Sequence, residues 1–162
     1  MKKELEDKLF KKYPKIFKQR KDPMTQTAMC WGISTDDGWY TIIDCLCDNM
    51  QYIIDEGIKT YHYYPFGRFI GGLFSNAKLV GRWKTEKVPQ VEAIQVKEKF
   101  GGLRFYYTGG SERTSELIHF VESLSYRVCE TCGSTKDVTQ TTGWIYSICQ
   151  ECQDKAEKRG KI

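Results

Sequence analysis

Histidine is almost absent from this chain of 162 residues, which contains only two. Neither His62 nor His119 has another histidine, a cysteine or an acid at the spacing of a metal site, and we expect His119 to be a surface or packing residue of a helix. Nucleophile-elbow, Walker-type and H-E-x-x-H motifs are also missing. Because no general base stands beside a nucleophile in a recognisable pattern, we predict that the protein is not an enzyme.

Long apolar runs are missing as well. No stretch approaches the roughly 20 apolar residues of a membrane span, and the start Met1-Lys2-Lys3-Glu4 does not resemble a secretory signal. We therefore expect a cytoplasmic protein without a membrane partner. The length suits one globular unit with a small appended module.

The chain has no strong excess of one charge, because its formal net charge is +4. Residues 1–21 hold nine lysines and arginines against three acids, and the last ten residues are also basic, so that residues 22–152 sum to −4. That balance does not favour a continuous phosphate-binding face in the middle of the chain. The basic ends could contact nucleic acid or act as solubilising tails, and we favour the second interpretation.

Cysteine is the residue whose pattern is informative. The chain has seven cysteines, and an odd number argues against a framework made only of disulfides. Cys30, Cys45 and Cys47 stand singly among apolar residues, and we interpret them as free thiols, with Cys45 and Cys47 packed inside the protein.

The other four cysteines form two C-x2-C pairs, Cys129 with Cys132 and Cys149 with Cys152, separated by sixteen residues. A C-x2-C turn directs two sulfurs toward one ion, and four thiolates complete a tetrahedral zinc site. We therefore predict one structural Zn²⁺ in a zinc ribbon, since four protein ligands leave no position for water or substrate. Redox dithiols or two disulfides are the alternatives, which a cytoplasmic chain without a thioredoxin-like pattern disfavours.

Apolar residues at helical spacing predict three helices, over residues 2–12, 36–56 and 112–127. Asp36 or Asp37 should cap the longest of them at its N-terminus. Gly57 should end that helix, because glycine readily takes the conformation that a helix C-terminus requires.

Alternating apolar residues predict a β-hairpin over residues 91–108, with its turn at Lys99-Phe100-Gly101-Gly102. Residues 58–90 crowd aromatic residues and glycines together without a clear period, so we expect an irregular insertion there. The chain should form an α+β fold over residues 1–127, with two main helices on a small antiparallel sheet centred on the hairpin. The zinc ribbon should follow at residues 128–155.

The predicted hairpin also places cations beside aromatic rings, a combination able to hold phosphate and stack a base. Residues of the insertion could complete such a pocket. The candidate ligand-binding or partner-binding residues are Lys97, Lys99, Arg104, Tyr106, Tyr64, Arg68 and Arg82. Alternate residues of a hairpin can also simply face water, and we favour that simpler interpretation.

Six short segments of the chain occur in an order and at spacings that are also found in a known protein family. They are Tyr13-Pro14-Lys15-Ile16-Phe17, Cys30-Trp31-Gly32-Ile33, Asp37-Gly38-Trp39-Tyr40, residues 96–107, Cys129-Glu130-Thr131-Cys132-Gly133, and Gly143-Trp144 ahead of Cys149. With these segments the chain resembles a family of small phage-encoded and prophage-encoded proteins that carry a VKEKFGGLRFY-type segment and a C-terminal zinc ribbon with four cysteine ligands. The resemblance covers most of the chain outside residues 58–88. It implies an accessory phage protein that meets host components and, by analogy, one that counters host defence.

Three functions are compatible with these features. The first, which we favour, is a non-enzymatic zinc-binding phage accessory protein that binds a host macromolecule, above all a host protein or protein complex, with aromatic and arginine anchors beside a rigid ribbon. The second is a nucleic-acid-binding protein that uses its basic ends and the cations of the hairpin, with an affinity that falls steeply with salt. The third is a binder of a small phosphorylated or nucleotide ligand.

Overall fold

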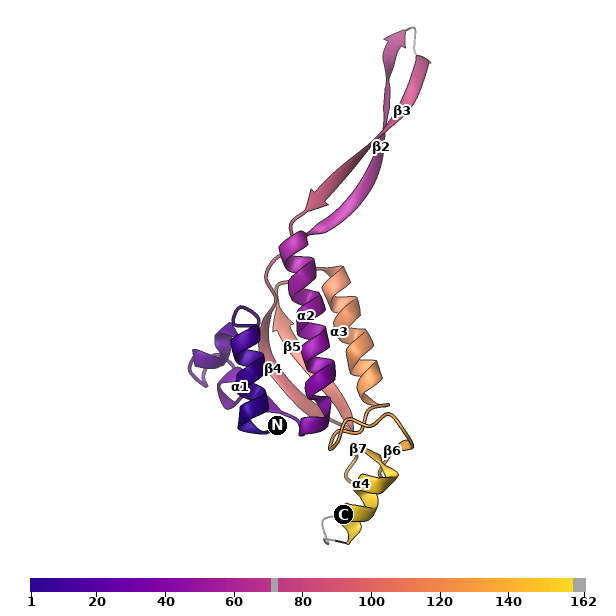
Figure 1. The fold of residues 1–162 in the computed structure, drawn as a ribbon. Helices are drawn as coiled ribbons and strands as arrows, with labels where there is room; N and C mark the ends of the chain where they lie inside the picture. Colours follow the sequence, from indigo (N-terminus) through magenta and orange to yellow (C-terminus); the bar gives the residue numbers. More distant parts are fainter. Residues whose placement is uncertain (71–72, 159–162) are drawn as a thin grey trace.

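The computed structural model describes residues 1–70 and 73–158, and for residues 64–70 and 73–80 it describes the backbone only. The chain folds as α+β, as expected, with a body of helices on a small sheet, a long two-stranded arm at one end and the cysteine-rich module at the other (Figure 1).

Two helices come from the N-terminal third of the chain. Helix α1 spans Lys3–Lys12, and helix α2 spans Tyr40–Glu56. Short 3-10 helices lie between them, at Lys18–Lys21, Met29–Trp31 and Asp37–Trp39. Helix α2 ends at Gly57, whose φ of 71° is one that residues with a Cβ rarely adopt, and this confirms the predicted stop.

The predicted N-terminal cap of α2 is wrong. The helix begins after the 3-10 turn, with Trp39 at the cap position, and neither Asp36 nor Asp37 makes a side-chain capping bond. Asp37 instead holds the start of the chain, because its Oδ1 accepts a hydrogen bond from the backbone N–H of Lys2 at 2.7 Å. That bond, against the opposing effect of burial, keeps the pKa of Asp37 below its usual range.

The central sheet has three strands in the order β1-β4-β5. Strands β4 (Glu92–Lys99) and β5 (Gly102–Thr108) form the predicted antiparallel hairpin. Its turn consists of Phe100 and Gly101, both with positive φ, as a two-residue turn of this hand requires. The sequence did not reveal the third strand, β1 (Ile33–Ser34), which pairs parallel to β4 and has only two residues.

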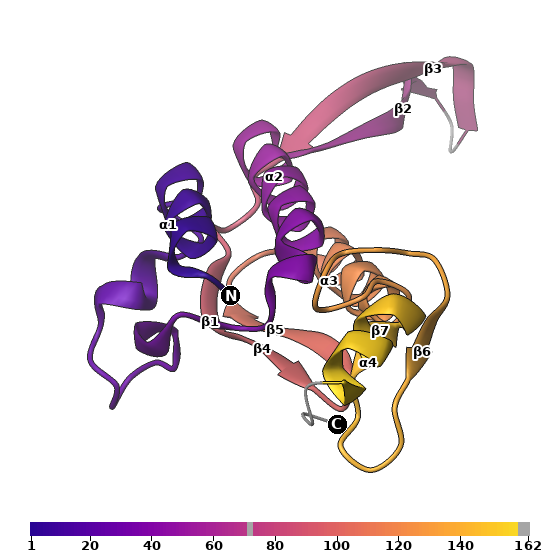
Figure 2. The same ribbon diagram turned by 60° about the horizontal axis from the view of Figure 1, so that its bottom comes forward.

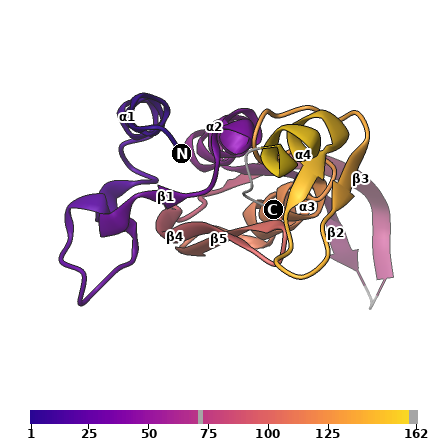
Figure 3. The same ribbon diagram turned by 90° about the horizontal axis from the view of Figure 1, so that it is seen from below.

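Helix α3 (Glu112–Ser125) returns after the hairpin and packs on both β5 and α2. Helices α2 and α3 cover the same face of the sheet (Figure 2), and α1 lies beside α2 on that side (Figure 3). The apolar core fills the space between them. Its largest fully buried side chains are Leu9, Ile16, Phe17, Met29, Trp39, Ile43, Leu46, Met50, Val91, Val96 and Leu103.

The expectation of an irregular insertion at residues 58–90 is wrong. Strands β2 (Ile58–Ile70) and β3 (Leu73–Glu86) pair antiparallel along most of their length, with one irregularity between Phe66 and Arg68. This β2–β3 arm projects from the body beyond the C-terminal end of α2 (Figure 1). These strands could not be predicted from the sequence because neither face of the arm packs on the core. Strands of this kind need no alternation of apolar and polar residues.

The three lone cysteines differ in their surroundings. Cys47 is buried in the core, as predicted, and burial raises the pKa of its thiol. Cys45 is exposed, so the expectation of a packed thiol is wrong at that position. Cys30 is half-buried, and its sulfur donates a hydrogen bond to the carbonyl of Thr27 at 3.2 Å.

Within residues 1–70 and 73–158, none of the helices has the length and apolar character needed to cross a membrane.

Candidate metal centre

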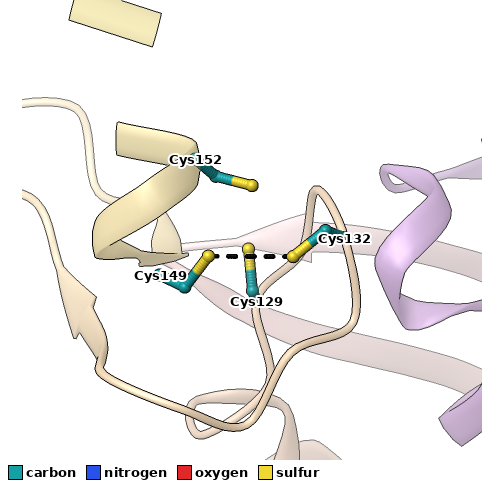
Figure 4. Close-up of side chains that lie close together, drawn as sticks. All are labelled: Cys129, Cys132, Cys149 and Cys152. Carbon is teal, nitrogen blue, oxygen red and sulfur yellow. Dashed lines mark hydrogen bonds between the residues drawn. The ribbon is translucent and has the colours of Figure 1, made fainter. Parts of the chain in front are cut away.

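One turn, the end of a strand and the first turn of a helix bring four cysteines together. Cys129 and Cys132 belong to the turn that follows α3, Cys149 ends strand β7 (Ser147–Cys149), and Cys152 lies in the first turn of helix α4 (Gln150–Glu157). Strand β7 pairs with β6 (Val138–Gln140), so the module is two cysteine turns joined by a short hairpin. Figure 4 shows the four side chains converging on one point.

The spacing of the sulfurs suits one metal ion. All four sulfurs lie within 4.8 Å of one another, and those of Cys132 and Cys149 are 3.7 Å apart. Sulfurs placed about 2.3 Å from a tetrahedral zinc would be about 3.8 Å apart. A disulfide needs about 2.05 Å, which the Cys132–Cys149 separation far exceeds. The four cysteines could therefore hold a metal ion, as the C-x2-C spacing predicted.

The protein backbone already favours one thiolate in this set. Burial raises the pKa of Cys129, but hydrogen bonds from the backbone of Cys149, Cys132 and Thr131 outweigh it, so the pKa of Cys129 is lowered. Burial raises the pKa of Cys132 and Cys152, and their contacts with Cys129 and Cys149 raise it further. Four thiolates this close repel one another, and a bound cation removes that repulsion.

Backbone bonds fix the first cysteine turn. The N–H of Gly133 donates to the carbonyl of Cys129, and the N–H of Cys129 donates to the carbonyl of Ser134, both at 2.8 Å. Gly133 has a φ of 79°, which explains the glycine directly after Cys132. The N–H of Glu130 donates to the carbonyl of Ser147 at 2.9 Å and so joins the first turn to strand β7.

Glu130, inside the first cysteine turn, holds the module on the body. Its Oε1 accepts the N–H of Asp36 at 3.0 Å, and its carbonyl accepts the N–H of Gly38 at 2.7 Å. Burial raises the pKa of the Glu130 carboxyl to about 7. The indole N–H of Trp39 donates to the carbonyl of Val128 at 2.9 Å, directly before Cys129. Residues 36–39 therefore hold the cysteine module on the body.

The β4–β5 turn supports the module from another side. The hydroxyl of Ser147, a buried residue, donates to the carbonyl of Gly101 at 2.6 Å. A Cβ on Gly101 would lie 2.8 Å from the side chain of Ile145, so the turn and the module are in direct contact. The cysteine module is therefore joined directly to the β4–β5 turn of the central sheet.

Comparisons of the chain with protein-family models, curated proteins and solved structures gave no match. What the site can do follows from its own geometry and chemistry. Four protein sulfurs around one ion would leave no coordination position for a substrate.

The hairpin candidates Lys97, Lys99, Arg104 and Tyr106 share the sheet face opposite the core, because Val96 and Phe105 on the other face are buried. Lys97 stands directly opposite Arg104 in the strand register. The Nζ of Lys97 lies 5.5 Å from the centre of the Tyr106 ring. The structure thus gathers four of the seven candidates in one place.

The other three candidates lie elsewhere. Arg82 is on the exposed β2–β3 arm, at the opposite end of the body from the β4–β5 turn (Figure 1). The side chains of Tyr64 and Arg68 lie outside the described residues. The idea that the insertion completes a pocket with the hairpin is therefore wrong for Arg82.

A groove that the sequence did not reveal lies where the β4–β5 turn, the end of α3 and strand β6 meet. It is lined by Phe100, Tyr126, Arg127, Val138 and Gln140, and we call it the junction groove. The ring of Phe100 is 66% exposed, and Trp144 in the neighbouring β6–β7 loop is 75% exposed. The sequence contained one indication of this groove, which is the phenylalanine in the hairpin turn. A turn with positive φ favours glycine or asparagine, so a phenylalanine there suggests a role other than forming the turn.

Replacing Gly38 should loosen the module from the body. A Cβ at this position would lie 2.3 Å from the carbonyl oxygen of Cys129 and 2.4 Å from the amide nitrogen of Gly133, and neither backbone can move without opening the cysteine turn. We expect Gly38→Ala to lower the free energy of unfolding by about 1–3 kcal/mol, measured by chemical denaturation. Gly143→Ala is the control, because no atom lies within 4 Å of its Cβ position and its cost is only that of a positive φ. Equal stability of Gly38→Ala and the parent would refute the close contact.

Proposed function

We propose that this protein is a non-enzymatic, zinc-stabilised phage accessory protein that binds an acidic surface of a host protein. The metal assignment rests on donor chemistry. Four thiolates are soft ligands, and their tetrahedral spacing suits Zn²⁺, whereas magnesium and calcium take oxygen ligands. The zinc has a structural role, and it fixes the module that forms one wall of the junction groove.

The observation that carries the proposed binding function is a set of cations on the sheet face opposite the core, where Lys99 is exposed and Lys97 and Arg104 are half-buried. No ion pair among the described residues involves Lys97, Lys99 or Arg104. Like charges directly opposite in a sheet, as Lys97 and Arg104 are, destabilise it. An acidic partner would remove that repulsion, so the pair is better suited to a complex than to the free protein.

The junction groove supplies the apolar part of such a contact. Aromatic and arginine residues are enriched at binding hot spots, and Phe100, Tyr126 and Arg127 line this groove. The exposed Trp144 lies next to Ile145, which contacts the β4–β5 turn. The guanidinium of Arg104 donates to the hydroxyl of Tyr126 at 2.7 Å, so the cations of the sheet adjoin the junction groove. We call Lys97, Arg104, Phe100, Arg127 and Trp144 together the platform.

The chain resembles small phage-encoded proteins in several segments. The segments shared with small phage-encoded proteins include residues 96–107, the strands that carry these cations, and the cysteine turn at Cys129. A protein of this kind acts inside a host cell on host components, and countering a host defence protein is the role we propose for it.

The platform can be tested by capture from a host-cell lysate with quantitative mass spectrometry. We expect Trp144→Ala and Lys97→Glu each to lower the recovery of one host protein at least tenfold, because loss of a hot-spot anchor costs about 2 kcal/mol or more. Trp31→Ala and Lys11→Glu are matched controls, since both residues are exposed and lie outside the platform. A host protein recovered equally with all four variants, or no specific host protein at all, would overturn the proposal.

A further inference from the structure

The β2–β3 arm concentrates positive charge. Residues 58–86 contain five lysines and arginines and a single acid, a net charge of +4 that equals the formal charge of the whole chain. The basic residues are Lys59, Arg68, Lys78, Arg82 and Lys84, and the acid is Glu86. The remaining residues sum to zero because acids elsewhere offset the positive excess of residues 1–21. The arm is therefore one of the strongly basic segments that an acidic partner would meet.

The shape of the arm is that of a free two-stranded ribbon. At about 3.3 Å per residue, the 13 residues of β2 extend roughly 40 Å. Figure 1 shows the arm standing away from the helices and the sheet along most of this length. The major groove of B-form DNA, about 12 Å wide, admits a two-stranded β-ribbon, whereas the narrow major groove of A-form RNA does not.

The two faces of the arm differ in chemistry where side chains are described. On one face, Lys84 stands opposite Thr60 and Arg82 stands opposite His62. No ion pair among the described residues involves Arg82. The ion pair of Lys84 is with Glu86 at 3.1 Å, and both side chains are more than half exposed, so a phosphate can replace this carboxylate at little cost.

The opposite face presents aromatic rings. Tyr61 stands opposite Trp83 with ring centres 4.9 Å apart, and Tyr63 lies 5.0 Å from Tyr61. Gly81 makes room for this cluster, since a Cβ there would collide with the Tyr61 ring. Even so, Tyr63 and Trp83 are each 66% exposed, because no element of the body covers them. Rings held in place but left exposed can contact sugars and base edges.

We infer that the β2–β3 arm binds duplex DNA by entering its major groove, with Arg82 and Lys84 on the phosphates and the Tyr61–Tyr63–Trp83 face toward the groove. Phosphate contacts position a protein without reading sequence, so this binding is independent of sequence. The arm lies at the other end of the body from the platform, and the inference stands or falls separately from the proposed host-protein contact.

Fluorescence anisotropy with a labelled duplex of about 30 base pairs tests the inference. With about four phosphates neutralised, the slope of log affinity against log salt is roughly −3.6, so raising salt from about 50 to 200 mM should weaken binding roughly 100-fold. Arg82→Ala combined with Lys84→Ala should weaken binding about tenfold and reduce the slope by about 2. Arg113→Ala combined with Lys136→Ala is the control, and both of these exposed cations lie outside the arm.

A second variant removes the arm. Ile58 and Glu86 are cross-strand partners, so an Asn-Gly turn can join their neighbours and replace residues 58–86. We expect this variant to keep its bound metal and its helical circular dichroism and to lose DNA binding. Undiminished binding by this variant, absence of duplex binding by the parent at low salt, or tighter binding of single-stranded DNA or duplex RNA would each overturn groove entry.

Discussion

Replacing Cys149 by alanine should release the metal and unfold the C-terminal module. Cys149 contributes one of four sulfurs, and three thiolates without the fourth hold zinc far more weakly. Because metal binding in such small modules supplies on the order of 10 kcal/mol, residues 129–152 should not stay folded without it. Hydrogen exchange read by mass spectrometry should show lost protection in this segment, with strand β4 and helix α2 still protected, and elemental analysis should show no bound metal.

Cys45→Ala is the matched control for this experiment. Cys45 is an exposed thiol outside the four-cysteine set, so its loss should change neither metal content nor protection. A Cys149→Ala protein that retained the metal and its protected amides would contradict the assignment of the four cysteines to one ion.

Replacing Trp39 by alanine should destabilise the body more than any surface change. The Trp39 side chain is fully buried, and its indole N–H donates to the carbonyl of Val128. The substitution leaves a large cavity and an unpaired carbonyl at the point where the body meets the module. We expect a loss of about 3–5 kcal/mol and a fall in Tm of roughly 10 °C, measured by denaturant and thermal unfolding.

Trp39→Phe separates the two contributions. Phenylalanine keeps an aromatic ring in the core but cannot donate to Val128, so the remaining loss of about 1–3 kcal/mol reports the unpaired carbonyl and the smaller cavity. If Trp39→Ala were as stable as Trp39→Phe, the buried position of this side chain would be refuted.

The parts of the fold that face the core could be predicted from the sequence. Helix α2 and the β4–β5 hairpin each bury one face, and burial imposes a period on apolar residues that the sequence displays. The four cysteines could be predicted for another reason. The C-x2-C spacing is set by the geometry of metal coordination and does not depend on how the core packs. That prediction needed no knowledge of the surrounding fold.

The β2–β3 arm could not be recognised by the same reasoning. Its described rings Tyr61, Tyr63 and Trp83 are exposed, so no boundary between core and solvent orders them. Gly71-Gly72 stands in the sequence between the two strands and is itself a hairpin signal. The positive charge of the arm was also missed, because the charge was summed over residues 22–152. Acids elsewhere in that range outweigh the arm's net charge of +4.

The contacts that seat the module on the body were equally hidden. Gly38 and Glu130 are 92 positions apart in the sequence, yet their backbones share a hydrogen bond of 2.7 Å. A glycine required by the approach of a distant backbone has no local signature, since its own φ is not positive. Asp36 and Asp37 stood before a helix as capping residues do, but the intervening 3-10 turn moved the helix start to Tyr40.

X-ray absorption at the zinc edge of the purified protein tests the central claim most directly. One zinc per chain, surrounded by four sulfurs at about 2.3 Å, is the result we expect from Cys129, Cys132, Cys149 and Cys152. A protein without zinc, or a zinc whose nearest neighbours include nitrogen or oxygen, would contradict it.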